Sequence, residues 1–93
     1  MADVYSKNPD VVFRQIADEY ILVPIRQKVV DLKSIYTLND VAAFVWQQID
    51  GKKDLETIKR QVLDGFDADP ALVDIDLKEI LLQWESLGLI HSQ

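Results

Sequence analysis

The sequence contains no cysteine and no apolar run that approaches the roughly 20 residues needed to cross a bilayer. Without cysteine, the chain can form neither a disulfide framework nor a metal site held by thiolates. Residues 1–10 also lack the basic and then apolar order of a signal peptide. We therefore expect a soluble, cytoplasmic protein that has no membrane partner.

Glycine and proline are scarce, with three of each among 93 residues. Hydrophobic residues make up 48% of the chain, which is typical of a folded globular protein rather than a disordered one. A chain of this length builds a single domain around one core. The formal net charge is −6. Because an acidic domain repels phosphate backbones, we do not expect nucleic acid as a partner.

Side chains that could perform chemistry are also few. The single histidine, His91, has no nucleophile or orienting group near it in the sequence. An EF-hand loop has a glycine at its sixth position and a closing glutamate, and the spacing of the acidic residues here provides neither. These residues are Asp64, Asp67, Asp69, Asp74 and Asp76. Helix caps and a solvated helix face account for them instead. We therefore expect a protein that is not an enzyme and that holds no metal or cofactor.

The clearest element is a helix over residues 70–87. Asp69 can cap its first free N–H groups, Pro70 fits its first turn, and Gly88 suits the left-handed residue that ends a helix. At about 100° per residue, one broad apolar stripe should face the core. This stripe contains Val73, Leu77, Ile80, Leu81, Trp84 and Leu87.

A second apolar strip lies on nearly the opposite side of the same helix. It consists of Leu72, Ile75 and Leu82. One core cannot cover both sides of the helix. A strand or the N-terminal segment could cover this strip, or the strip could form a groove for a partner peptide or a second subunit.

The N-terminal half favours strands. Residues 1–9 are polar and predict a flexible tail, and the domain proper should cover residues 10–90. Residues 10–16 and 20–25 predict two strands joined by a hairpin, with Pro24 at a strand end or on an edge. The stretch 26–34 could form a third strand or a loop.

Two more helices are predicted between this half and the helix over residues 70–87. Asn39 caps a helix over about 40–49, and Asp54 caps one over about 54–64. With the strands confined to residues 10–38, the expected fold is α+β, with a three-stranded antiparallel sheet followed by three helices. This layout is similar to the winged helix-turn-helix.

Several runs of the sequence resemble the PqqD family. These runs are NPDVVFRQI, LVPI, IYTLND, FVWQQIDG, LETIKRQVLDGFDAD and LLQWESLGLI. The likeness covers about residues 8–90. The family is named for pyrroloquinoline quinone (PQQ) synthesis, and its fold is the peptide-recognition element of many systems that modify ribosomally made peptides.

The resemblance implies that a leader peptide binds as an added strand between the third strand and the third helix. The residues that would bind it on the strand are Ser34, Ile35, Tyr36 and Thr37. On the helix, Leu72, Ile75 and Leu82 would form an apolar floor, and Lys78 and Glu79 would read charge on the leader. The stretch 26–34, which replaces a short turn of many family members, could lengthen the groove or fold over it.

We therefore expect a non-catalytic module that presents a precursor peptide to a modifying enzyme, which in the family is a radical S-adenosylmethionine (SAM) protein. The alternative is a module of the same fold that binds another partner. A winged-helix DNA-binding regulator is disfavoured by the acidic residues of the last helix. The protein would be a monomer or a homodimer that exchanges its N-terminal strands.

Overall fold

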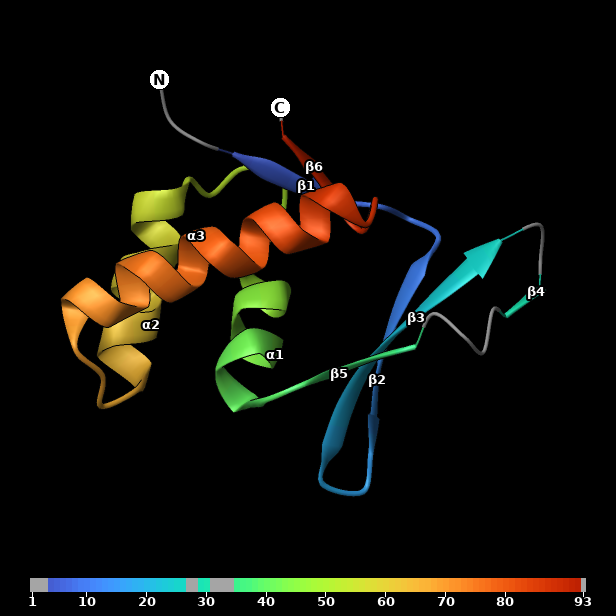
Figure 1. Ribbon diagram of the computed structural model, residues 1–93, viewed down its shortest axis with the longest axis horizontal. Helices are drawn as coiled ribbons and strands as arrows, with labels where there is room; N and C mark the ends of the chain where they lie inside the picture. The colour runs from blue at the N-terminus through green and yellow to red at the C-terminus, as the bar shows by residue number, and fades with distance from the viewer. Residues whose placement is uncertain (1–3, 27–28, 31–34, 93) are drawn as a thin grey trace.

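A computed structural model describes residues 4–26, 29–30 and 35–92 of the chain. The predicted fold class is confirmed, because three helices follow an antiparallel sheet (Figure 1). The helices are α1 (Asp40–Gln48), α2 (Leu55–Gly65) and α3 (Pro70–Ser86). The strands are β1 (Tyr5–Lys7), β2 (Val11–Ile16), β3 (Glu19–Arg26), β4 (Val29–Val30), β5 (Tyr36–Leu38) and β6 (Ile90–Ser92).

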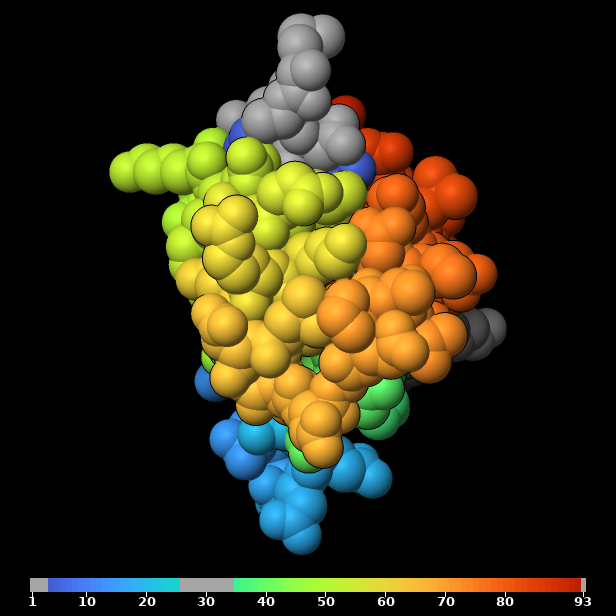
Figure 2. Space-filling view, turned by 90° about the vertical axis from the view of Figure 1, so that its left-hand side faces the viewer, coloured from blue at the N-terminus to red at the C-terminus, as the bar shows by residue number. Residues whose placement is uncertain are grey.

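Strand β3 lies at the centre of the main sheet. It pairs with β2 along one side, and with β5 and the two-residue strand β4 on the other. The hairpin of β2 and β3 projects beyond the helices, whereas α2 and α3 lie side by side on the face shown in Figure 2. Of the stretch 26–34, only Arg26 and residues 29–30 lie among the described residues.

The expectation that Pro24 sits at a strand end or on an edge is wrong, because Pro24 lies inside β3. The backbone N–H of the next residue, Ile25, donates to the Asp10 carbonyl beside β2 at 2.7 Å. Since neighbouring backbone groups of a strand point to opposite sides, the Pro24 nitrogen faces away from β2. In the described chain, pairing on that side runs to Leu22 with β5 and resumes at Ile25 with β4. The missing N–H therefore removes no hydrogen bond to β2.

The helices begin at the predicted caps. The side-chain oxygen of Asn39 accepts a hydrogen bond from the Ala42 N–H at 2.7 Å. Asp54 and Asp69 do the same for α2 and α3, each at 2.8 Å from its donor nitrogen. Hydrogen bonds from Thr57 hold the pKa of the Asp54 carboxyl below its usual value. After α3, Gly88 takes the left-handed conformation predicted for it, with φ of 76°.

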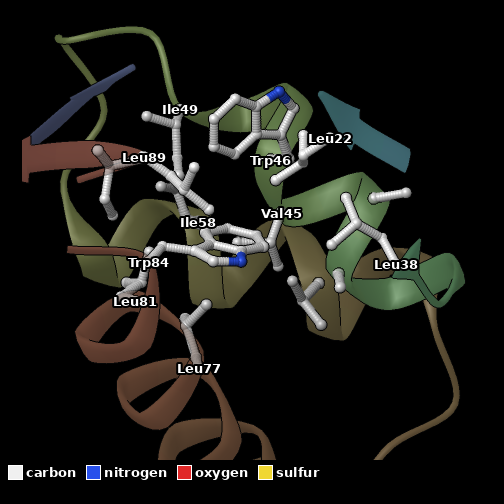
Figure 3. Close-up of a cluster of buried hydrophobic side chains, with 14 of the residues drawn as sticks. Leu22, Leu38, Val45, Trp46, Ile49, Ile58, Leu77, Leu81, Trp84 and Leu89 are labelled. Carbon is white, nitrogen blue, oxygen red and sulfur yellow. The ribbon is translucent and has the colours of Figure 1, made fainter. Parts of the chain in front are cut away.

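The core lies where α1, α2 and α3 meet the sheet (Figure 3). Trp46 of α1 and Trp84 of α3 are buried and meet edge to face, with their ring centroids 5.4 Å apart. Leu22 of β3 and Ile58 of α2 are buried in the same cluster. Trp84 thus packs in the core, as its place in the apolar stripe of residues 70–87 predicted.

The prediction of a flexible tail over residues 1–9 is wrong for its described part. Tyr5–Lys7 form β1, which pairs with β6 in a second, antiparallel sheet. The ammonium nitrogen of Lys7 lies 5.5 Å from the centroid of the Trp46 ring, and burial lowers the Lys7 pKa. The polar sequence hid this strand because its stability comes from pairing with the far end of the chain.

The second apolar strip of α3 is exposed. Leu72, Ile75 and Leu82 expose 59%, 53% and 68% of their surface, so no strand and no described part of the N-terminal segment covers them. We call these three residues the outer strip. None of the described helices has the length and apolarity required to cross a membrane.

Two neighbouring leucines of α3 should differ sharply in what they contribute to stability. Leu81→Ala should lower the free energy of unfolding by about 2–5 kcal/mol, because Leu81 is buried in the core. Leu82→Ala is the matched control and should change it by no more than about 0.5 kcal/mol. Urea unfolding followed by tryptophan fluorescence measures both values, and equal losses would contradict this orientation of α3.

Removal of residues 1–7 should lower the midpoint of thermal unfolding, because β6 loses its paired strand and Trp46 loses its contact with Lys7. Removal of residues 1–3 alone, which leaves β1 in place, is the control. Circular dichroism melts of the two truncated proteins and the full chain make the comparison. Identical midpoints for all three would show that β1 adds nothing to the fold.

Candidate functional site

A groove runs between β5 and the C-terminal half of α3, with a volume of about 360 Å³. The strand side is lined by Ile35, Tyr36, Thr37 and Leu38, and the helix side by Ile80, Gln83, Trp84 and Leu87. Asn39 and Ala42 close the end nearest α1. We call this feature the β5–α3 groove. It lies between the strand and the helix named by the sequence prediction.

Strand β5 turns one backbone edge toward this groove. Tyr36 and Leu38 pair with Leu22 and Tyr20 of β3. The even-numbered residues of β3 point their backbone groups toward β5, because Ile25 points its own toward β2. The backbone N–H and C=O of Thr37 consequently point away from β3. Since β5 pairs only with β3 among the described strands, this edge is open.

The helix side of the groove is apolar at its floor and polar at its rim. Trp84 lines the groove and is buried, whereas Ile80 is half-buried. Leu87 and Gln83 are exposed. These side chains share one side of α3 because residues three, four and seven apart lie close on a helix. An apolar side chain that entered the groove would therefore contact Trp84, and a polar backbone would remain near Gln83.

The structure brings three of the four predicted strand residues together. Ile35, Tyr36 and Thr37 line the groove, and Ser34 lies outside the described residues. Ile35 and Thr37 are exposed, and Tyr36 is half-buried.

The predicted helix residues do not line the β5–α3 groove. The outer strip and Glu79 are exposed on the side of α3 that faces solvent, roughly opposite the core stripe. The expected apolar floor is instead formed by Trp84 and Ile80. The outer strip was singled out because it was the apolar surface left over by the core, but the groove uses the margin of the core stripe itself.

Lys78 lies on the side of α3 toward α2. Its ammonium nitrogen is 3.0 Å from a carboxylate oxygen of Asp74, and Lys59 of α2 is 3.3 Å from the other. The two lysines hold the pKa of Asp74 below its usual value through these hydrogen bonds. The charge of Lys78 is therefore paired within α3, and the ion pair that joins α3 to α2 is that of Asp74 with Lys59.

The sequence-based prediction missed Ile80, Gln83, Trp84 and Leu87 as groove residues. Ile80, Trp84 and Leu87 were assigned to the core, and Trp84 does belong to it. A signal was nevertheless present, because the core stripe is wider than the face that one small core can bury. The residues at the edge of this stripe therefore had to contact something other than the core. Gln83 is the polar residue next to that edge.

The groove continues at both ends. Toward α1 it shares Asn39, Ala42 and Ile80 with a hollow of about 280 Å³ between α1, α2 and α3. Toward β1 it shares Tyr36 and Leu87 with a more polar hollow of about 240 Å³. The result is a continuous trough whose two ends differ in polarity.

The polar hollow is shaped by Asn8. The Asn8 amide donates to the Gly88 carbonyl at 3.0 Å, and its carbonyl accepts from the Asp10 N–H at 2.9 Å. These bonds tie the segment between β1 and β2 to the end of α3. No group of acidic, histidine or cysteine side chains in the described residues could hold a metal ion, and His91 is exposed on β6.

We compared the chain with protein families, curated proteins and solved structures. A sequence model of the family described as "Coenzyme PQQ synthesis protein D (PqqD)" matches residues 15–90. No curated protein matches the chain. A solved structure, "TbiB1 in Complex with the TbiA(beta) Leader Peptide", superposes with a TM-score of 0.73 at 21% sequence identity. The match covers 92% of this chain and 94% of that one, and shows that the two share a fold.

Amide hydrogen exchange should alternate along β5 if its outer edge is open. The Thr37 amide should exchange quickly, because its N–H points into the groove, whereas the Leu38 amide should be protected by its bond to β3. Exchange followed by nuclear magnetic resonance (NMR) resolves the two. A Thr37 amide as protected as that of Leu38 would mean that the edge is already paired.

Proposed function

The chain belongs to the PqqD family, and we propose that it binds the leader of a ribosomally made precursor peptide in the β5–α3 groove. The observation that carries the proposal is the open backbone edge of Thr37 beside an apolar helix wall. An extended peptide needs both features, because the strand edge supplies main-chain hydrogen bonds and the wall supplies side-chain contacts.

The peptide would add a strand to the main sheet next to β5. Its backbone would exchange hydrogen bonds with Thr37, and with Ile35 if pairing extends one step further. Alternate side chains of the peptide would point toward α3, because successive residues of a strand face opposite sides. Those side chains would meet Trp84 and Leu87, which line the groove. Main-chain pairing would give affinity, and these contacts would select the sequence.

The TbiB1 structure supports the proposal, because that protein shares this fold and is in complex with a leader peptide. The groove also suits a peptide better than a nucleic acid. The exposed side of α3 carries Asp76, Glu79 and Glu85, whereas Lys78 is paired with Asp74. Such a helix would repel the phosphates that flank a DNA groove.

The partner that completes the function would be a modifying enzyme, and we propose a radical SAM protein. The chain would contribute position rather than chemistry, because a bound leader raises the effective concentration of the attached core peptide at the enzyme. The alternative is another protein that inserts an extended segment into the same groove. The two differ in the ligand but not in the geometry of binding.

Selection from a displayed library of random peptides tests this proposal and does not require the natural precursor. We expect enriched peptides to slow amide exchange at Thr37 and to shift NMR signals of Tyr36, Trp84 and Leu87. The result that would overturn the proposal is a failure to enrich any peptide, or enriched peptides that leave Thr37 exchange unchanged.

Two substitutions at one position isolate the strand edge. Thr37→Pro removes the outward N–H but no bond to β3, and proline is tolerated on edge strands. This substitution should lower the affinity for the enriched peptides by about tenfold or more. Thr37→Val keeps the N–H and the size of the side chain, and should bind normally. Equal affinities for both variants, with unchanged circular dichroism, would argue against strand addition.

A further inference from the structure

The hollow between α1, α2 and α3 has the character of a side-chain pocket. Its floor is formed by core residues, including Val45, Val62 and Leu77, which are buried. Its walls include Val41 of α1 and Ala68 of the turn between α2 and α3, both exposed. We call it the apolar hollow.

The size of the apolar hollow suits a large side chain. Its volume is about 280 Å³. An apolar cavity of about 150 Å³ in another protein holds benzene and stays dry without it. A leucine, methionine or phenylalanine side chain therefore fits in the space. Water gains little there, because Asp76 at the rim and Asn39 are the polar members of the lining, and the Asn39 carbonyl already accepts the bond that caps α1.

The apolar hollow is continuous with the β5–α3 groove. Asn39, Ala42 and Ile80 line both. It lies past the Leu38 end of β5, where the strand gives way to α1. A peptide paired with Thr37 and running toward α1 would have to pass over the opening of the hollow. The occupant that the geometry favours is consequently part of the same bound peptide.

We propose that the apolar hollow receives one bulky apolar side chain of the peptide bound on β5. This inference rests on the proposed function and adds a rule of recognition to it. Ligand peptides carry a leucine, isoleucine, methionine or aromatic residue just beyond the segment that pairs with Thr37. At the opposite end of the trough, where Asn8 and Asp10 line the polar hollow, polar residues are accommodated.

Filling the hollow from the protein side tests the rule. The probes are peptides enriched from the displayed random library on the unmodified chain, which should share one bulky apolar position. Ala68→Phe and Val41→Phe place a ring in the hollow from two different elements, the turn between α2 and α3 and helix α1. Each substitution should lower the affinity for these peptides by about tenfold or more, because the apolar side chain of the peptide can no longer be buried in the hollow. Ala71→Phe is the matched control, since Ala71 is exposed on the first turn of α3 and does not line the hollow.

Compensation separates a filled pocket from a distorted fold. A peptide whose bulky apolar residue is replaced by alanine should bind the filled variants as well as it binds the unmodified chain. Unchanged affinity for both filled variants overturns the inference, and so does a loss that the alanine peptide does not escape. In either case Thr37 exchange still reports on the groove. If the enriched peptides slow amide exchange at Thr37, the proposed peptide binding stands and only the side-chain pocket is wrong. If they leave Thr37 exchange unchanged, both the proposed function and the pocket are wrong.

Discussion

The structure depends on the contact between Trp46 and Trp84, which joins the first and third helices at the centre of the core. An edge-to-face aromatic pair contributes about 0.5–1.5 kcal/mol beyond the burial of its surface. Trp84 also forms the floor of the β5–α3 groove. The same side chain therefore stabilises the fold and shapes the candidate site, so the groove floor is as fixed as the core. A site built this way loses little entropy on binding, because its walls are already ordered.

The third helix faces the core, the groove and solvent on different sides. One side is buried, and contributes Leu77 and Leu81 to the core. The neighbouring side, with Ile80 and Leu87, faces the groove. The outer strip remains exposed, so the helix has apolar side chains on two sides. The stripe of Val73, Leu77, Leu81 and Trp84 indicated which side is buried, but the sequence did not decide what the outer strip meets. Its rotation is fixed by the burial of Trp84 and by the ion pair of Asp74 with Lys59 of α2.

An open strand edge is normally a liability, because it can pair with another copy of the chain. Here the edge is limited in two ways. Strand β5 has only three residues, so it offers few backbone groups to a flat, extended partner. The wall formed by α3 then lies across the groove from that edge. An edge with these limits admits an isolated extended peptide more readily than it admits aggregation.

The sequence by itself determined the class of fold and the limits of its helices. Asn39, Asp54 and Asp69 cap the helices as predicted, because a cap depends on bonds between residues two or three positions apart. Tyr36 and Thr37 were placed in the groove through the family resemblance. Local patterns of this kind do not depend on the rest of the chain.

Only the tertiary structure decided which long-range pairs form. It joined residues 5–7 to residues 90–92, and it placed Pro24 within the central strand with its nitrogen facing away from β2. It also left the outer strip exposed to solvent and placed Ile80 and Trp84 along the groove. The physical reason is the same in each case. Strand pairing and the surroundings of a second apolar strip are set by contacts between distant segments, and neither a polar strand nor such a strip encodes its partner in its own pattern.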